Sequence, residues 1–136
     1  MAWLLGTNAA LATPNDPASG VAARPRRLAA GEAFVPSVVL HELYYGAFRS
    51  ARSARNAALV DGLRFGVLDL DREDAREAGA IRPDLAARGT PIGPYDVLIA
   101  GQARARGLVL VTRNTTGAFA RVPGLRVEDW TGAAPG

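Results

Sequence analysis

The chain has 136 residues, the length of one domain, and leaves no room for two independent catalytic domains. Hydrophobic residues make up 49% and charged residues 21%, which excludes an intrinsically disordered chain and predicts a packed core. All 16 basic residues are arginine, and a net charge of +3 spread over a domain does not by itself indicate nucleic-acid binding.

The absence of cysteine excludes disulfide bonds, thiolate metal sites and a cysteine nucleophile. The longest apolar runs are far shorter than the roughly 20 residues that cross a bilayer, so we expect no membrane-spanning helix. The first residues lack the basic start of a signal peptide, and a cytoplasmic location is therefore expected.

Short apolar runs alternate with helical patterns in the first half of the chain. A polar turn, Gly6–Asn8, is expected after the first strand, and Ser37 is expected to be the N-cap of the second helix. The predicted strands are Trp3–Leu5, Ala33–Pro36 and Val67–Leu70, and the predicted helices are Ser19–Ala30, Ser37–Ala47 and Ser53–Leu63.

The second half continues the alternation. Asp71 is expected to cap a helix that runs toward Arg88 and kinks at Pro83. Pro94 suits the first position of the next helix, which ends at Arg106 and carries Asp96 in its first turn. The remaining predicted elements are a buried strand at Leu108–Thr112, a polar loop at Arg113–Gly117, an edge strand at Leu125–Glu128 and a flexible tail at Thr131–Gly136.

This order of elements predicts a single α/β domain over residues 1–136, with a central, mostly parallel sheet flanked by helices on both faces. Ligands of such sheets bind beyond the carboxyl ends of the strands. We expect the turn at Gly6, the loop at Asn114 and the helix starts at Glu42 and Asp96 to gather at that edge.

Glu42 and Asp96 each lie among apolar residues, where a solvated charge is unusual. Two carboxylates about 4 Å apart repel by about 4 kcal/mol at an effective dielectric of about 20, so a pair needs a proton, an arginine or a cation. With one histidine and no cysteine, the cation would be Mg²⁺ or Mn²⁺. A metal site and plain salt bridges to arginine both remain open at this stage.

The other polar motifs favour no further catalytic site. His41-Glu42 lacks the second histidine of a zinc-protease helix, and His41 is expected to face solvent or cap a neighbour. Neither a phosphate-binding glycine loop nor a Gly-x-Ser-x-Gly turn is present. Six further acids are spaced as on a solvated face: Asp69, Asp71, Glu73, Asp74, Glu77 and Asp84.

Four segments in fixed order carry a resemblance to a known family. They are Leu4–Asn8, Val38–Gly46, Gly89–Ala100 with its Thr-Pro-Ile-Gly-Pro-Tyr-Asp sequence, and Val111–Thr115. The chain resembles a PIN-domain ribonuclease of the VapC toxin type from Leu4 to Trp130.

The resemblance implies a Mg²⁺- or Mn²⁺-dependent endoribonuclease that is the toxin of a toxin–antitoxin pair. Its partners would be RNA, a VapB-type antitoxin and a second copy in a homodimer, with DNA reached only through the antitoxin. Glu42 and Asp96 match the family's second and third acids, both metal ligands. Asn114 matches a fourth site position, and Thr7 and Asn8 match polar residues beside the first acid.

Gly6 occupies the position of the family's first catalytic aspartate, so two carboxylates remain where the family has three. This departure predicts a weakened or inactive ribonuclease that keeps its fold and antitoxin surface. The alternative is a non-catalytic antitoxin-binding module of the same fold. A nucleotide-binding regulator is disfavoured because no glycine-rich phosphate loop is present.

Two groups of surface residues leave alternatives open. Arg113, with Arg88 and Arg104 or Arg106, is expected either to contact RNA phosphates or antitoxin acids or to be plain surface arginine. The aromatic group Tyr44, Tyr45 and Phe48 forms either a partner contact or part of the core.

Overall fold

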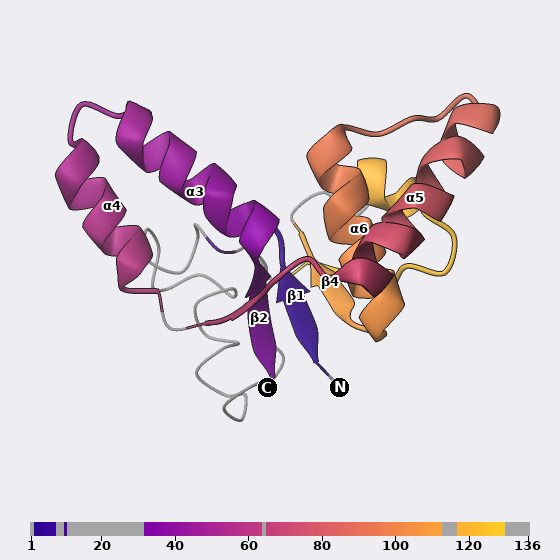
Figure 1. Cartoon of the computed structure of the whole chain (residues 1–136), viewed down its shortest axis with the longest axis horizontal. Coiled ribbons are helices and arrows are strands. Elements are labelled where there is room, and N and C mark those ends of the chain that lie inside the picture. The colour runs from indigo at the N-terminus through magenta and orange to yellow at the C-terminus, as the bar shows by residue number, and fades with distance from the viewer. Residues whose placement is uncertain (1, 8–9, 11–31, 64, 113–116, 130–136) are drawn as a thin grey trace.

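The computed structural model describes residues 2–7, 10, 32–63, 65–112 and 117–129. Its elements in chain order are β1 (Trp3–Leu5), β2 (Ala33–Pro36), α3 (Ser37–Arg49), α4 (Ser53–Asp61), β3 (Gly66–Leu68), α5 (Arg72–Ala87), α6 (Pro94–Arg106), β4 (Val109–Val111), the short 3₁₀ helix η1 (Ala118–Arg121) and β5 (Val127–Glu128) (Figure 1). The helix predicted at residues 19–30, the tail at 131–136 and most of the loop at 113–117 lie outside the described residues.

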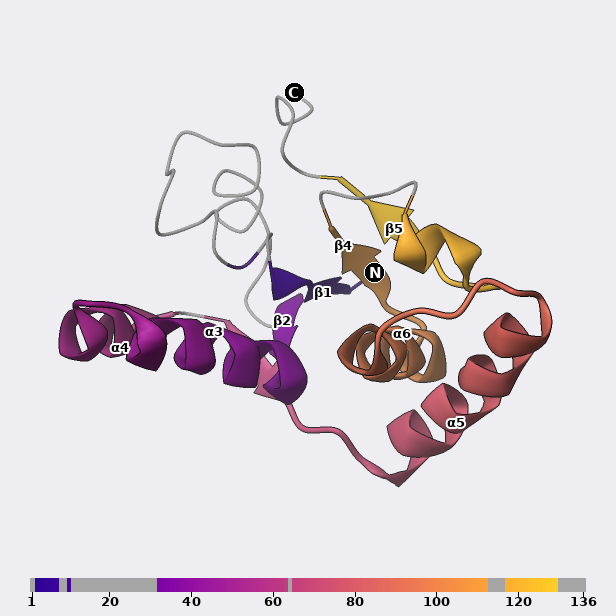
Figure 2. The same cartoon turned by 90° about the horizontal axis from the view of Figure 1, so that it is seen from above.

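The five described strands form one sheet in the order β3-β2-β1-β4-β5, and every pairing is parallel. The predicted α/β architecture is therefore confirmed. From β1 the chain moves outward through β2 to β3, and it then crosses back to β4 and β5 on the other side of β1. Because parallel crossovers are right-handed, this reversal places α3 and α4 on the opposite face from α5 and α6. Figures 1 and 2 show the two helix pairs on either side of the strands.

The sheet is buried most deeply at its centre. Leu4 and Leu5 of β1 and Leu110 of β4 have no exposed surface, as the continuous apolar runs of two-sided parallel strands predict. Val67 on the outer strand β3 is 45% exposed. The strand order reverses between β1 and β4, so the crevice beyond their carboxyl ends is the position where open α/β sheets bind ligands.

The helix pair α5 and α6 packs at very short range. A Cβ atom built on Gly101 would lie 2.6 Å from the Cβ of Ala78, so only glycine fits at this crossing. Pro94 is the first residue of α6, as predicted, and its missing N–H costs nothing there.

Several predicted boundaries were wrong by one or two residues. Ser37 is the first residue of α3 rather than its N-cap, because the extended backbone of Pro36 ends β2 and passes directly into the helix. A turn was expected over Gly6–Asn8, but Thr7 is already helical, so the prediction was wrong at that residue. Strand β3 ends at Leu68, before the predicted Leu70. By contrast, helix α5 continues through Pro83 to Ala87 with Arg88 as its C-cap, in line with its predicted course toward Arg88.

No helix among the described segments is both long and apolar enough to span a membrane.

Candidate active site

Gly6 lies at the carboxyl end of the central strand. Its N–H donates to the carbonyl oxygen of Val111 at 2.9 Å, which ties the end of β1 to the end of β4. Its own carbonyl accepts from Ala10 N–H at 3.0 Å, so helical backbone begins immediately after the strand. Gly6 is buried, and it is not among the glycines with positive φ. The backbone conformation at this position therefore does not require glycine.

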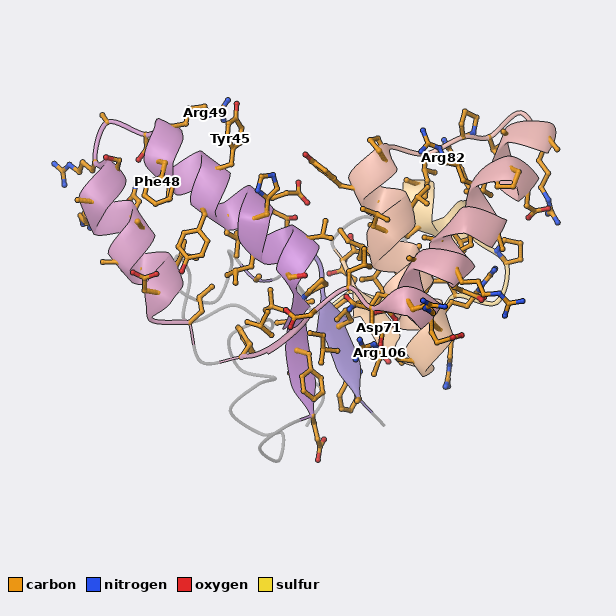
Figure 3. The ribbon with its side chains drawn as sticks, viewed as in Figure 1. Tyr45, Phe48, Arg49, Asp71, Arg82 and Arg106 are labelled. Atoms are coloured by element: carbon orange, nitrogen blue, oxygen red, sulfur yellow. The ribbon has the colours of Figure 1, made fainter. Side chains whose placement is uncertain are left out.

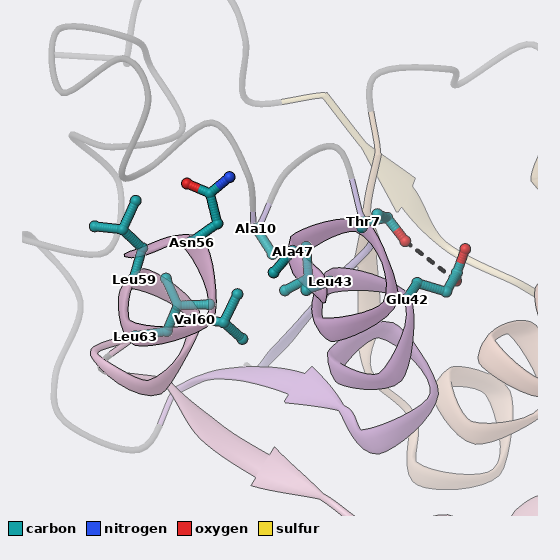
Figure 4. A pocket seen from close by; sticks show the side chains of 10 residues that line it. Thr7, Ala10, Glu42, Leu43, Ala47, Asn56, Leu59, Val60 and Leu63 are labelled. Carbon is teal, nitrogen blue, oxygen red and sulfur yellow. Dashed lines mark hydrogen bonds between the residues drawn. The ribbon is translucent and has the colours of Figure 1, made fainter. Parts of the chain in front are cut away.

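Glu42 reaches the same edge from the neighbouring strand. Helix α3 starts directly after β2 and carries Glu42 in its second turn, where the side chain is half-buried. The hydroxyl of Thr7 donates to Glu42 Oε1 at 3.2 Å (Figure 4). A residue directly after β1 thus orients a carboxylate of α3.

Asp96 lies in the first turn of α6, next to the Gly93 N-cap, and it is half-buried. Burial raises the pKa of its carboxyl group above the ordinary value. The ion pairs found within the described ranges involve neither Asp96 nor Glu42. The salt-bridge alternative for these two acids therefore has no support among those residues.

The residues that precede the two acids are in contact. The rings of His41 and Tyr95 meet edge to face with centroids 5.7 Å apart. This contact brings α3 and α6 together at the turns that carry Glu42 and Asp96. His41 is otherwise exposed, in line with the expectation that it faces solvent.

A pocket of about 260 Å³ opens beside Glu42, between α3 and α4 (Figure 4). Thr7 and Glu42 form its polar end, and Asn56 is its other polar residue. The rest of the lining is apolar or glycine: Ala10, Leu43, Gly46, Ala47, Leu59, Val60 and Leu63. Asp96 does not line this pocket.

Comparison with known proteins identifies the family. The PIN domain model matches residues 4–125. The chain belongs to the PIN-domain family. It is similar to the tRNA(fMet)-specific endonuclease VapC of Shigella flexneri, with 47% identity over 133 residues, 95% of this chain and 98% of that protein. Its fold is similar to a chain of the DNA-bound VapBC of Salmonella typhimurium, with 42% identity, a TM-score of 0.88 and coverage of 96% and 98%.

VapBC2 of Rickettsia felis, solved with a promoter DNA fragment, gives the same TM-score of 0.88 at 32% identity, covering 96% of this chain and 99% of that one. The relatives place the chain with the VapC-type toxin ribonucleases of the PIN-domain family. Several of the similar structures are VapBC complexes, which supports a VapB antitoxin as the partner.

PIN-domain ribonucleases of the VapC type generally depend on a divalent metal ion. The described residues do not fit a complete site for such an ion. No three Asp, Glu or His side chains among them form a group that could hold a metal. Gly6 offers no ligand, and one of the two acids expected at this site, Glu42, accepts a hydrogen bond from Thr7. Asn8, Arg113 and Asn114 lie outside the described residues.

One acid of this PIN domain was misjudged from sequence. Asp74, expected on a solvated face, is completely buried. It accepts hydrogen bonds from Arg106 Nε at 3.1 Å and Nη2 at 2.9 Å, and from Gln102 Nε2 at 3.1 Å. Burial by itself would raise the pKa of Asp74, but the hydrogen bonds from Arg106, the Asp71 N–H and Gln102 outweigh it and hold the pKa below its ordinary value.

The local sequence signal around Asp74 indicated a helix cap but not burial. Asp71 and Asp74 form a capping box at the start of α5, with each side chain accepting from the other residue's N–H. Two arginines that were candidates either for RNA or antitoxin contact or for plain surface positions instead pair with acids of α5. Arg106 pairs with Asp74, and Arg104 binds Glu77 and the carbonyl of Pro123.

Proposed function

We propose that this chain is the toxin of a VapBC-type pair whose RNA cleavage is greatly weakened or lost, while its fold and antitoxin-binding surface are kept. The observation that supports weakened cleavage is Gly6. This residue provides no side chain at the end of the central strand, between Glu42 on one side and β4 on the other. The proposed partners are a VapB-type antitoxin, an RNA substrate in the cytoplasm and a second copy of the chain. The proposed cofactor is Mg²⁺ or Mn²⁺.

The remaining acids support a site built for positive charge. Glu42 and Asp96 are half-buried without a guanidinium partner among the described residues, and the pKa of Asp96 is raised. Thr7 holds the Glu42 carboxylate in one orientation. In a complete site a divalent ion would polarise the scissile phosphate and activate water. With Gly6 in place, the proposed charge at this edge is roughly −2 instead of −3, too little to hold a strongly hydrated ion well.

The backbone at Gly6 accepts a side chain with a small adjustment. A Cβ atom would lie 3.1 Å from the carbonyl oxygen of Val111, so that neighbour must shift by a few tenths of an ångström. No positive φ adds strain. The aspartate can therefore be restored without rebuilding the sheet.

The test compares RNA cleavage by the unmodified chain and by Gly6→Asp, with Mg²⁺ or Mn²⁺, on the initiator tRNA named for the Shigella flexneri and Salmonella typhimurium relatives. We expect Gly6→Asp to cleave at least about 100-fold faster, equivalent to about 2.7 kcal/mol in the activation barrier. Gly6→Asn and Gly6→Ala carry the same Cβ without the negative charge and are expected to stay as slow as the unmodified chain. Equal and robust cleavage by the unmodified chain and Gly6→Asp would refute the proposal.

The second candidate is a non-catalytic module that binds or titrates antitoxin, and Gly6 is also the observation that favours it. It predicts tight antitoxin binding with no RNA cleavage, even at high Mn²⁺ concentration and even after Gly6→Asp. Thermal unfolding of Gly6→Asp serves as the control, because a variant that folds but does not cleave supports this second candidate.

A further inference from the structure

The outer ends of α3 and α4 carry a group of exposed arginine and aromatic side chains that the site described above does not use. We define this α3–α4 tip by Tyr45, Phe48, Arg49, Arg52 and Arg55. Tyr45 is 60% and Phe48 66% exposed, and the three arginines are also exposed. The aromatic residues therefore lie on the surface of the monomer and not in its core. Figure 3 shows Tyr45, Phe48 and Arg49 together at the far end of α3.

Within the part of the chain that the structure describes, no acid pairs with the arginines of the tip. The sequence contains no Asp or Glu from Leu43 to Val60. The ion pairs in the described part of the chain lie on α5 and α6 and leave Arg49, Arg52 and Arg55 without an acidic partner there. Arg52 is the N-cap of α4, whose first turn has no acidic residue, so the helix dipole adds to the positive potential rather than reducing it.

The tip is held rigidly. Ser50 N–H and Ser50 Oγ both donate to the carbonyl of Ala47, at 3.2 Å and 2.6 Å, and Asn56 Nδ2 donates to Ser50 Oγ at 2.8 Å. The guanidinium of Arg49 lies over the Tyr45 ring at 5.2 Å. Tyr44 stacks on Phe48, with centroids 6.0 Å apart, and its hydroxyl donates to Asp61 at the end of α4. These contacts fix the connection between the two helices and orient the exposed rings.

The tip is continuous with the candidate site. Glu42, Tyr45 and Arg49 are spaced i, i+3 and i+7, so they follow one stripe of α3. At a rise of 1.5 Å per residue, Arg49 is about 10 Å along the helix from Glu42. A chain that passed the Glu42 carboxylate along this stripe would meet first the Tyr45 ring and then the arginines.

We infer that the α3–α4 tip binds the single-stranded part of the RNA substrate that flanks the cleavage position. The inference rests on the proposed function, which supplies RNA as the substrate. Arginine neutralises phosphates, and exposed aromatic rings stack on unpaired bases without requiring a sequence. A polyanion with flat faces complements both features of the tip, whereas an apolar partner would leave three guanidinium groups without counter-charges.

The experiment measures the fluorescence anisotropy of a labelled, unstructured RNA of about a dozen nucleotides with the full unmodified chain, over a range of NaCl concentrations. Cleavage is not needed for this readout. The combined substitution Arg49→Ala, Arg52→Ala and Arg55→Ala is expected to weaken binding by about 10-fold or more and to lower the salt slope by about 2. Tyr45→Ala with Phe48→Ala is expected to weaken binding by about 5-fold or more with little change in slope.

The matched control removes three exposed arginines elsewhere, by Arg72→Ala, Arg76→Ala and Arg82→Ala on α5. Figure 3 shows Arg82 on the opposite side of the molecule from Phe48 and Arg49. The α5 control variant changes the net charge by the same amount as the tip variant. If contact with the tip matters, the control variant should reduce RNA binding far less than the tip variant does. If the alanine set at the tip fails to fold, the glutamine set at the same three positions makes the comparison.

Equal losses for the tip and control sets, unchanged binding in the tip set, or no RNA binding by the unmodified chain would each overturn the inference. The inference also fails if the aromatic pair abolishes dimer formation or antitoxin binding but leaves RNA affinity intact, because the tip is then a protein interface. Failure of Gly6→Asp to cleave tRNA would defeat the proposed catalytic function alone, since the binding measurement does not depend on that variant.

Discussion

Two groups of carboxylates in this molecule have opposite environments. On the α5–α6 side, Asp74 is fully buried and accepts hydrogen bonds from Arg106, Gln102 and the Asp71 N–H. At the carboxyl edge of the sheet, Glu42 and Asp96 are half-buried and unpaired with arginine within the described residues. A buried acid with several hydrogen-bond donors indicates a structural role, whereas the half-buried acids without an arginine partner at the strand-order reversal are those for which we propose a ligand.

The largest expected effect separates these groups by activity. In the Gly6→Asp background, Glu42→Gln and Asp96→Asn should each lower RNA cleavage by at least about 100-fold, or about 2.7 kcal/mol in the activation barrier. Asp74→Asn in the same background should retain most of the cleavage rate at temperatures where the variant is folded. Rates measured under single-turnover conditions make the comparison, and a loss for Asp74→Asn as large as for Glu42→Gln would remove the distinction between the groups.

The second-largest expected effect distinguishes the two groups of carboxylates by their contribution to the free energy of unfolding. Arg106→Ala leaves the buried Asp74 without its cation and should lower the free energy of unfolding by about 3 kcal/mol. Arg82→Ala, which removes an exposed arginine from α5, should change it by less than about 0.5 kcal/mol. Urea unfolding of both variants gives the comparison. Similar stabilities for the two would show that the Arg106–Asp74 pair contributes little.

The elements that were predicted correctly carry local signals. The buried runs at β1 and β4, Pro94 at the start of α6 and the Asp71 cap of α5 each depend on residues adjacent in sequence. The parallel sheet followed from their alternation. The start of α3 was misplaced by one residue, because Pro36 serves both as the last strand residue and as the helix N-cap. The ends of β3 were also misplaced by one or two residues.

The contribution of distant residues could not be predicted in the same way. The acidic residues around Asp74 have the spacing of a solvated helix face, and its burial depends on Arg106, which is 32 residues away in sequence. The contact of Thr7 with Glu42 spans 35 residues. The expectation that Glu42 and Asp96 lie at one edge came from strand topology and the family resemblance, and their roles as ligands stay a prediction.

The two groups should also respond to pH with opposite sign. Asp74 has a lowered pKa, so its contribution to stability is present above the unfolded value of about 3.9 and is lost as the pH falls through its folded pKa. Asp96 has a raised pKa, so its contribution is present below about 3.9 and is lost as the pH rises through its folded pKa. The free energy of unfolding should therefore be measured across the acid range for Asp74→Asn and Asp96→Asn. Asp74→Asn should lack the loss of stability that the unmodified chain shows as the pH falls, and Asp96→Asn should lack the loss that it shows as the pH rises. The same change in both variants would contradict the assignment.

The smallest effect is a gain in stability at the candidate site. Because burial disfavours the charged form of Asp96, Asp96→Asn should raise the free energy of unfolding at neutral pH by less than about 1 kcal/mol. Glu73→Gln, on the exposed start of α5, is the control, and it should lower stability slightly since it removes a negative charge from a helix N-terminus. Asp96 and Glu73 each lie in the first turn of a helix, so both substitutions remove a charge that the helix dipole favours. The two positions differ in burial, because Asp96 is half-buried and Glu73 is exposed. A loss of stability for Asp96→Asn as large as for Glu73→Gln would mean that the dipole outweighs burial, and Asp96 would then belong with the structural acids of α5 rather than with Glu42.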